Sequence, residues 1–174
     1  AIKHDITILS MHTNMDNARG GVNFKMAEKM QLTGVKFFTE KQVDGITCGS
    51  GVMGELPGAM AADDFIMMLK REFDVECVQC NQLLRRPIRT VAICGGAGSF
   101  LLPEAIAAGA DAFVTGEMHY HDYFAHEQEI QIAVIGHYQS EQYTYEIFKS
   151  IIEEQCEGVR CVVTSQNTNP IIYL

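Results

Sequence analysis

The chain has 174 residues, 47% of them hydrophobic, and a formal net charge of −9 at pH 7, which suits one compact domain over residues 1–174. Its basic residues are scattered, and no apolar run approaches the ~20 residues of a membrane-spanning helix, so neither nucleic acid nor a membrane is an expected partner. No signal-peptide pattern opens the chain, and its six cysteines are far fewer than a disulfide scaffold needs, so we expect a cytoplasmic protein with reduced thiols.

The first third of the chain predicts a strand, a loop and a helix, followed by an ambiguous region. Residues 6–11 form an apolar run typical of a strand. After Gly20 and Gly21, apolar residues recur at helical spacing over residues 22–30. The region 35–48 begins with apolar residues that suggest a strand, and its polar remainder leads into a glycine-rich loop.

The rest of the chain alternates helices and strands. An amphipathic helix is predicted over residues 61–73, with two aspartates near its N-terminal end, where the helix dipole favours negative charge. A long helix is predicted over residues 140–155, and four of its apolar side chains are expected to face the core: Ile147, Phe148, Ile151 and Ile152. Further helices are predicted at 100–108 and 120–126, and strands at 75–80, 90–94, 112–115, 130–135 and 159–164.

This alternation predicts an α/β fold, a layered sandwich with a mixed, mostly parallel sheet flanked by helices. In folds of this kind, ligands bind in the crevice at the carboxyl ends of the strands. Functional residues are therefore expected in the loops that follow strands.

Two such loops share one pattern, in which a histidine precedes a carboxylate by four residues. His12 and Asp16 form the first pair, and His137 and Glu141 form the second. At the junction of a strand and a helix, this spacing can turn an imidazole nitrogen and a carboxylate oxygen toward one point, a combination suited to Zn, Mn or Fe(II). Either pair alone fits a histidine at a strand end beside a solvated acid. Two copies at equivalent positions favour a divalent-metal site.

The segment 116–122 also follows an apolar strand and contains two histidines and two acids. It could supply a further metal ligand or a general base. His121 is the candidate for a catalytic role, ahead of His119. The alternative is a polar loop that lies over the edge of the sheet and has no chemical role.

A glycine-rich loop at 95–99 follows a predicted strand and opens a helix. Its backbone N–H groups, together with the helix N-terminus, could bind an anion such as a phosphate. The residues concerned are Gly95, Gly96, Gly98 and Ser99. A tight turn that lets the strand and the helix pack closely explains the same residues equally well.

Three other patterns do not support a function. Residues 49–54 match G-x-G-x-x-G, but Pro57 and Gly58 follow, so no helix opens there to receive a pyrophosphate. Cys77 and Cys80 form a C-x-x-C pattern within one predicted strand, where residues three apart point to opposite faces, so neither metal nor redox use is expected. No G-x-S-x-G elbow or P-loop lysine is present to support serine chemistry or standard NTP hydrolysis.

Four ordered segments, 12–16, 91–99, 116–122 and 136–141, together resemble the Nif-three-like family, whose members are often named GTP cyclohydrolase I type 2 homologues. The resemblance extends to the closing segment 167–170. It implies an α/β protein with two similar halves, assembled into a toroidal homohexamer, with two divalent metals (Zn, Fe or Mn) per subunit. It also implies four metal ligands, the last a bridging carboxylate: His12, Asp16, His137 and Glu141.

The chain departs from the family it resembles in two places. Relatives supply further ligands from an adjacent His-His pair in an N-terminal half, and this sequence has no such pair. Many relatives also carry an inserted domain after the segment corresponding to residues 35–42, which here leads almost directly to the Gly49 loop. Because the sequence begins at Ala1 on an element-like segment, we expect the family's metal-binding core without its first half. Four protein ligands suffice for one tetrahedral metal, whereas two metals would need ligands from water or another chain.

Two functions from different classes follow from these residues and from the resemblance. The first is a metal-dependent hydrolase of a nucleotide or another phosphorylated small molecule, in which Glu141 or His121 moves protons and the 95–99 loop holds phosphate. The family name suggests GTP, but no residue pattern specifies a purine. The second is a non-catalytic metal-binding scaffold, metal carrier or regulatory partner-binding protein. A truncated relative with a vestigial site is a third interpretation.

Overall fold

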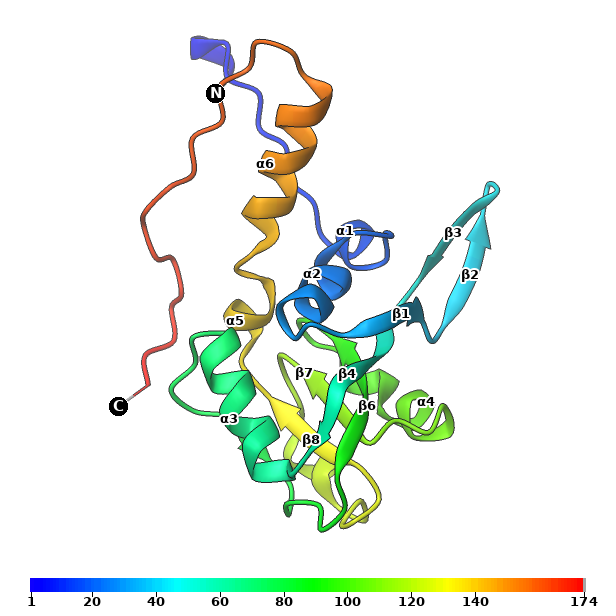
Figure 1. The fold of residues 1–174 in the computed structure, drawn as a ribbon. Coiled ribbons are helices and arrows are strands. Elements are labelled where there is room, and N and C mark those ends of the chain that lie inside the picture. Colours follow the sequence, from blue (N-terminus) through cyan, green and yellow to red (C-terminus); the bar gives the residue numbers. More distant parts are fainter. Residues whose placement is uncertain (174) are drawn as a thin grey trace.

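A six-stranded sheet, in the order β1-β4-β6-β7-β8-β5, forms the centre of the computed structural model (Figure 1). The structure describes residues 1–173, and position 174, the end of the predicted domain 1–174, lies outside the described residues. Of the four inner strands, β6, β7 and β8 run parallel to one another, and the pairs β1–β4, β4–β6 and β8–β5 are antiparallel. The strands are β1 (Thr33–Phe37), β4 (Val52–Met60), β5 (Gln79–Cys80), β6 (Ile88–Cys94), β7 (Ala112–Thr115) and β8 (Gln131–Val134).

The parallel strands are buried on both faces, which explains their nearly continuous apolar sequences. Every residue of β7 and β8 is buried. Their register pairs Cys94 with Thr115, and Thr115 in turn with Val134. The loops that follow the three strands therefore start side by side at one edge of the sheet, where α/β proteins bind ligands.

Helices cover both faces of this sheet, which confirms the predicted fold class (Figure 1). Alternate residues of β6 enter two cores: Ile93 packs in the core under α2 and α3, and Ala92 packs in the core under α4. No helix within residues 1–173 is long and apolar enough to cross a membrane. The helices are α1 (Thr13–Asp16), α2 (Val22–Lys29), α3 (Ala62–Glu72), α4 (Leu102–Ala107), α5 (His137–Glu141) and α6 (Thr144–Gln155), with 3-10 turns at Ile2–His4, Ser99–Leu101 and Tyr120–Tyr123.

A separate hairpin of β2 (Glu40–Val43) and β3 (Ile46–Gly49) projects from the β1 side of the sheet (Figure 1). Asp44 and Gly45 form its two-residue turn, and both have positive φ, as a type I′ turn requires. All four residues of β2 are exposed. The ambiguous region 35–48 is therefore the end of a strand followed by an exposed hairpin.

Two predicted strands are wrong. Residues 6–11 and 159–164 are irregular and largely exposed, and neither pairs with a strand in the part of the chain that the structure describes. Ile8, for example, is 76% exposed. An apolar pattern identifies side chains that suit a strand, but a strand also needs a neighbour to accept its backbone hydrogen bonds. The strand predicted at 75–80 shortens to β5, and the helix predicted at 120–126 is a 3-10 turn.

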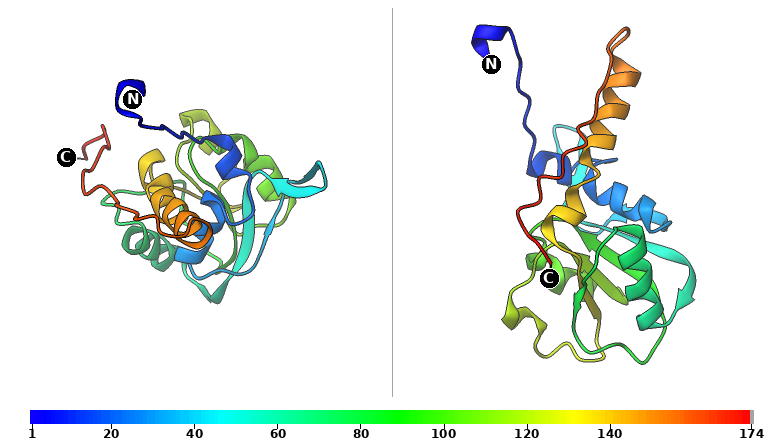
Figure 2. Two further views of the ribbon diagram at one scale, coloured as in Figure 1. Left: turned by 90° about the horizontal axis from the view of Figure 1, so that it is seen from above. Right: turned by 90° about the vertical axis from the view of Figure 1, so that its left-hand side faces the viewer.

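The long helix predicted over residues 140–155 is in fact two helices. α5 ends at Glu141 and α6 begins at Thr144. Between them, the side-chain amide of Gln142 donates from Nε2 to the Phe73 carbonyl at 3.2 Å. α6 rises away from the sheet (Figure 2). Its predicted packing was wrong, because none of the four apolar side chains expected in the core is buried: Ile147, Phe148, Ile151 and Ile152.

Candidate metal centre

The second histidine–carboxylate pair lies at the carboxyl end of the parallel strands. β8 leads into Gly136, whose φ of 98° favours glycine, and α5 starts at the next residue, His137. His137 and Glu141 are four residues apart on this helix, so they project from the same side. Nε2 of His137 lies 3.4 Å from Oε2 of Glu141. The structure therefore brings this predicted pair together.

The first pair flanks α1: His12 immediately precedes the helix, and Asp16 is its last residue. Burial raises the pKa of Asp16, and the nearby His12 and His137 rings oppose that rise. Asp16 is therefore within electrostatic reach of the histidine of the second pair as well as its own.

Glu141 is subject to the same group of charges. Burial raises the pKa of Glu141, the adjacent His137 lowers it, and the Asp16 carboxylate raises it again. The nearby His12 also lowers the pKa of Glu141. The four predicted ligands therefore share one electrostatic environment, in which a divalent cation would offset the two partly buried carboxylates.

Cys94, the last residue of β6, supports this placement. Burial raises the pKa of its thiol to about 12, and the Asp16 and Glu141 carboxylates contribute to the rise. One acid from each pair therefore acts on the same buried thiol. At neutral pH this thiol stays protonated and unreactive.

The buried side chain of Asn23 links the first pair to the glycine loop 95–99 through hydrogen bonds. Asn23 on α2 donates from Nδ2 to the Asp16 carbonyl at 3.0 Å and accepts from the Gly95 N–H at 2.8 Å. Asn23 is only 1% exposed. Sequence reasoning missed Asn23, although a polar residue among the apolar positions of an amphipathic helix is a signal for such a role.

A buried serine fastens the second pair to the same loop. Ser140 donates from Oγ to the His137 carbonyl at 2.8 Å and accepts from the Gly96 N–H at 2.9 Å. Gly96 has a positive φ of 60°, and a Cβ there would overlap Oε1 of Glu141. The positive φ of Gly96 favours glycine there, and the loop lies directly beside the Glu141 carboxylate.

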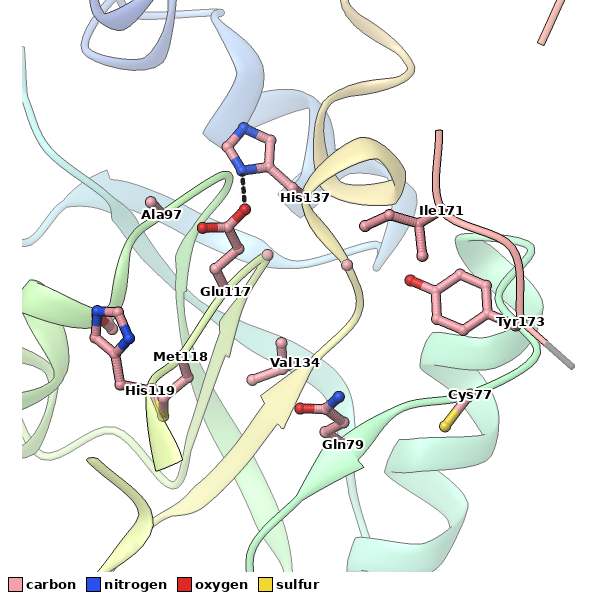
Figure 3. Close-up of a pocket in the computed structure, with 13 residues that line it drawn as sticks. Cys77, Gln79, Ala97, Glu117, Met118, His119, Val134, His137, Ile171 and Tyr173 are labelled. Carbon is pink, nitrogen blue, oxygen red and sulfur yellow. Dashed lines mark hydrogen bonds and ion pairs between the residues drawn. The ribbon is translucent and has the colours of Figure 1, made fainter. Parts of the chain in front are cut away.

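His137 also contacts a third loop, and two cavities adjoin it. Its Nδ1 lies 2.6 Å from Oε1 of Glu117 (Figure 3). The two cavities have volumes of about 400 Å³ each and share Glu117, His137 and Ile171 as lining residues. One cavity extends past Ser99 and His119. A small molecule in either cavity would lie beside the His137 ring.

Of the four predicted ligands, only His137 and Glu141 are in direct contact in the structure. Among residues 1–173, no group of three or more His, Cys, Asp and Glu side chains is arranged to hold a metal ion. The imidazole and carboxylate donors nevertheless match the preferences of first-row divalent metals. Burial of the Asp16 and Glu141 carboxylates, which raises both pKa values, also fits a cation at this place.

Comparison with known proteins decides the family. A sequence profile of the Duf34/NIF3 (NGG1p interacting factor 3) family matches residues 1–170. The chain belongs to this family. The resemblance seen in the sequence is thereby confirmed.

Curated relatives of this NIF3 chain carry one name. A "GTP cyclohydrolase 1 type 2 homolog" from Streptococcus pneumoniae is 33% identical over 124 residues, which cover 69% of this chain and 45% of the relative. A protein of the same name from Clostridium perfringens is 28% identical over 177 residues, which cover 99% of this chain and 66% of the relative. The chain therefore spans only about half to two thirds of the length of these relatives.

Solved structures share the NIF3 fold. A hypothetical protein from Staphylococcus aureus matches with a TM-score of 0.89 at 25% identity, over 99% of this chain and 70% of that protein. A Bacillus cereus protein described as related to NIF3 matches with a TM-score of 0.83 at 21% identity, over 99% of this chain and 75% of that protein. The mixed sheet flanked by helices is thus the family architecture.

In this NIF3 chain, three N–H groups of the glycine loop are bonded within the protein and do not support the predicted anion site. Those of Gly95, Gly96 and Gly98 all donate to side-chain oxygens of the protein itself: Asn23, Ser140 and Thr115. These three donors are therefore not free for a phosphate. Ser99 lines a cavity, and its role in binding stays a prediction. The tight-turn interpretation accounts for the glycines.

The segment 116–122 places its two histidines differently. His119 lines a cavity beside His137, whereas the His121 ring packs edge-on against Tyr120, with ring centroids 5.5 Å apart. His121 is not among the residues that line that cavity, so its catalytic role stays a prediction. Sequence reasoning did not single out Glu117, because its partner is 20 positions away.

Proposed function

We propose that this chain binds divalent metal through its two histidine–carboxylate pairs and hydrolyses a nucleotide or another phosphorylated small molecule. The observation that carries the proposal is the contact of 3.4 Å between His137 Nε2 and Glu141 Oε2 beside two cavities. Asp16, within electrostatic reach of His137, supports a shared site.

The proposed ligands are the four residues singled out by spacing and resemblance: His12, Asp16, His137 and Glu141. Two metals per subunit, Zn, Fe or Mn, and a homohexamer complete the proposal, and both rest on the family resemblance. When bound, a divalent metal supplies Lewis-acid polarisation and makes a nucleophile available at neutral pH.

The chain's own residues have separate tasks in this proposal. Glu141 lines one of the two cavities, and as a metal ligand its carboxylate would be deprotonated whenever the metal is bound. Ser99 and His119 line the cavity and can donate hydrogen bonds to a phosphorylated substrate. The chain's net charge of −9 repels anions, so an anionic substrate depends on cations at the site.

One observation favours the second function, a non-catalytic metal-binding scaffold, metal carrier or regulatory protein. The N–H groups of three loop glycines are already bonded within the protein, so the loop contributes no ready phosphate cradle from them. Metal binding without turnover is consistent with that arrangement.

Metal content per chain, measured by elemental analysis, tests the shared part of both functions. We expect metal in the wild type, and its loss in a double variant with His12→Ala and His137→Ala. A wild type free of metal after growth and reconstitution with Zn²⁺, Mn²⁺ and Fe²⁺ would refute both.

Turnover then separates the two functions. Nucleotides and simple phosphoesters are incubated with the metal-loaded protein and with the double variant, and released phosphate or altered base is followed. Metal-dependent turnover that the double variant lacks supports the hydrolase. Full metal occupancy without turnover on any of these compounds supports the binding protein. Size-exclusion chromatography with light scattering tests the homohexamer.

A further inference from the structure

His137 has a carboxylate beside each of its two ring nitrogens. Nδ1 is 2.6 Å from Oε1 of Glu117, and Nε2 is 3.4 Å from Oε2 of Glu141. A neutral imidazole carries one N–H donor and one lone pair. Both neighbours are acceptors, but only the Nδ1 contact has hydrogen-bond geometry, so in the neutral ring it assigns the N–H to Nδ1. The lone pair is then left on Nε2, on the side of the ring that faces Glu141.

The backbone after β7 explains how Glu117 reaches this ring. The N–H of Gly116 donates to the Gly96 carbonyl at 3.0 Å. A Cβ at Gly116 would lie 2.7 Å from that carbonyl oxygen and from Ser140 Oγ, and 2.9 Å from the Cα of His137. No side chain fits in this space, so glycine lets the loop pass directly over the start of α5. The next residue, Glu117, then reaches the His137 ring.

We propose that Glu117 is the positioning residue of His137, which holds the ring as the Nδ1–H tautomer and aims the Nε2 lone pair at the point shared with Glu141. The proposal rests on the metal site proposed above. Metal-ligating histidines usually donate their second ring N–H to a carboxylate, carbonyl or water, and loss of that partner weakens metal binding by about 10–100-fold. Glu117 thus acts through His137 and is not itself a ligand.

The chain offers a matched control for this contact. Nδ1 of His126 lies 2.7 Å from Oε2 of Glu129, almost the same distance as the 2.6 Å at His137. Neither residue of this second contact lines the two cavities beside His137. Glu129→Ala therefore removes an equivalent histidine–carboxylate contact away from the proposed ligands.

Metal affinity is the first test. Zn²⁺ and Mn²⁺ are titrated by calorimetry into the metal-free protein, as the wild type, Glu117→Ala, Glu117→Gln and Glu129→Ala. We expect Glu117→Ala to bind about 10–100-fold more weakly, and Glu129→Ala to match the wild type. Glu117→Gln keeps an acceptor oxygen and nearly the same shape, so its loss should be smaller. Equal affinities of Glu117→Ala and Glu129→Ala would overturn the proposal.

The tautomer of His137 is the second test and needs no metal. Long-range ¹H–¹⁵N correlation spectra of the histidine rings, recorded at a pH where the rings are neutral, report which nitrogen carries the proton. We expect the Nδ1–H form in the wild type and in Glu129→Ala, and a shift toward the Nε2–H form in Glu117→Ala. An unchanged His137 signal in Glu117→Ala would overturn the positioning role.

The two readouts also separate this proposal from the proposed function. A wild type that binds no metal, with a tautomer that responds to Glu117→Ala, supports the positioning contact and refutes the metal site. A wild type that binds metal, with an affinity and a tautomer that ignore Glu117→Ala, supports the metal site and refutes the positioning role.

Discussion

The two histidine–carboxylate pairs have the same sequence spacing, but the chain segments that precede them differ. His137 and Glu141 begin and end a helix that directly follows β8, a strand buried along its whole length. His12 and Asp16 follow residues 6–11, which lie exposed and outside the sheet. Only the second pair makes a direct contact, at 3.4 Å. The spacing of four residues therefore determines which side chains can come into contact. The buried strand before His137 and Glu141 fixes the position of that contact in the fold.

The largest difference between the pairs should appear in metal binding. His137→Ala removes a ligand from the formed pair, so we expect a loss above the ~100-fold that an outer partner can cause. His12→Ala removes a ligand that lies on an exposed segment, and its effect should be smaller. Calorimetric titration with Zn²⁺ measures both. Equal losses would show that metal organises the two pairs to the same degree.

The two buried hydrogen-bonding side chains should come next. Asn23→Ala and Ser140→Ala each leave buried backbone groups without a partner, which costs about 1–3 kcal/mol. Because one kcal/mol corresponds to about 2–4 °C in Tm for a chain of this size, thermal melting resolves both. The exposed Ser150→Ala should change stability by less than ~0.5 kcal/mol and serves as control. A Tm for Asn23→Ala equal to that of this control would show that the first pair is not fastened through α2.

A smaller effect is expected in the pH dependence of the metal-free protein. An acid whose pKa is raised in the folded state stabilises the fold below its unfolded pKa of about 4, and this contribution is lost as pH rises through the raised value. Asp16→Asn with Glu141→Gln should therefore raise Tm at pH 7 in the presence of a chelator, and the gain should vanish near pH 4. Melting curves across this range check the prediction. A lower Tm for the double variant at pH 7 would contradict it.

The smallest effect should come from the segment before the first pair. Ile8 is 76% exposed, so Ile8→Ser should change the free energy of unfolding by less than ~0.5 kcal/mol. Denaturant titration measures this value. A larger loss of unfolding free energy would mean that residues 6–11 pack against the domain in solution. Both pairs would then follow a packed segment.

The sequence predicts best those strands that are buried on both faces, because burial on both faces requires apolar side chains along the whole strand. Residues 112–115 and 130–135 are mostly apolar because both faces of β7 and β8 are covered, and the sequence predicts both strands within one residue at each end. Residues 159–164 are similarly apolar, yet no neighbouring strand is there to pair with them among residues 1–173. Sequence alone does not supply that neighbour.

The same distinction applies to the candidate site. The contact between His137 and Glu141 is local to one helix, so spacing alone predicts it. The use of the Gly95 and Gly96 N–H groups is not local, because their acceptors lie 72 and 44 positions away in the sequence. Long-range partners of this kind decide whether a glycine loop binds a ligand or holds two loops together.

The exposed hairpin has a consequence for how this chain tolerates extra sequence. Val43 and Ile46 are paired across the turn, so a polypeptide inserted between Asp44 and Gly45 would leave and re-enter the fold at neighbouring positions. Lengthening a flexible loop costs only about 0.6 kcal/mol for each doubling. The loop after β7 has no such freedom, because a Cβ at Gly116 would lie 2.7 Å from the Gly96 carbonyl oxygen and 2.9 Å from the Cα of His137. A reporter domain can therefore be carried at the hairpin tip without disturbing the residues around His137.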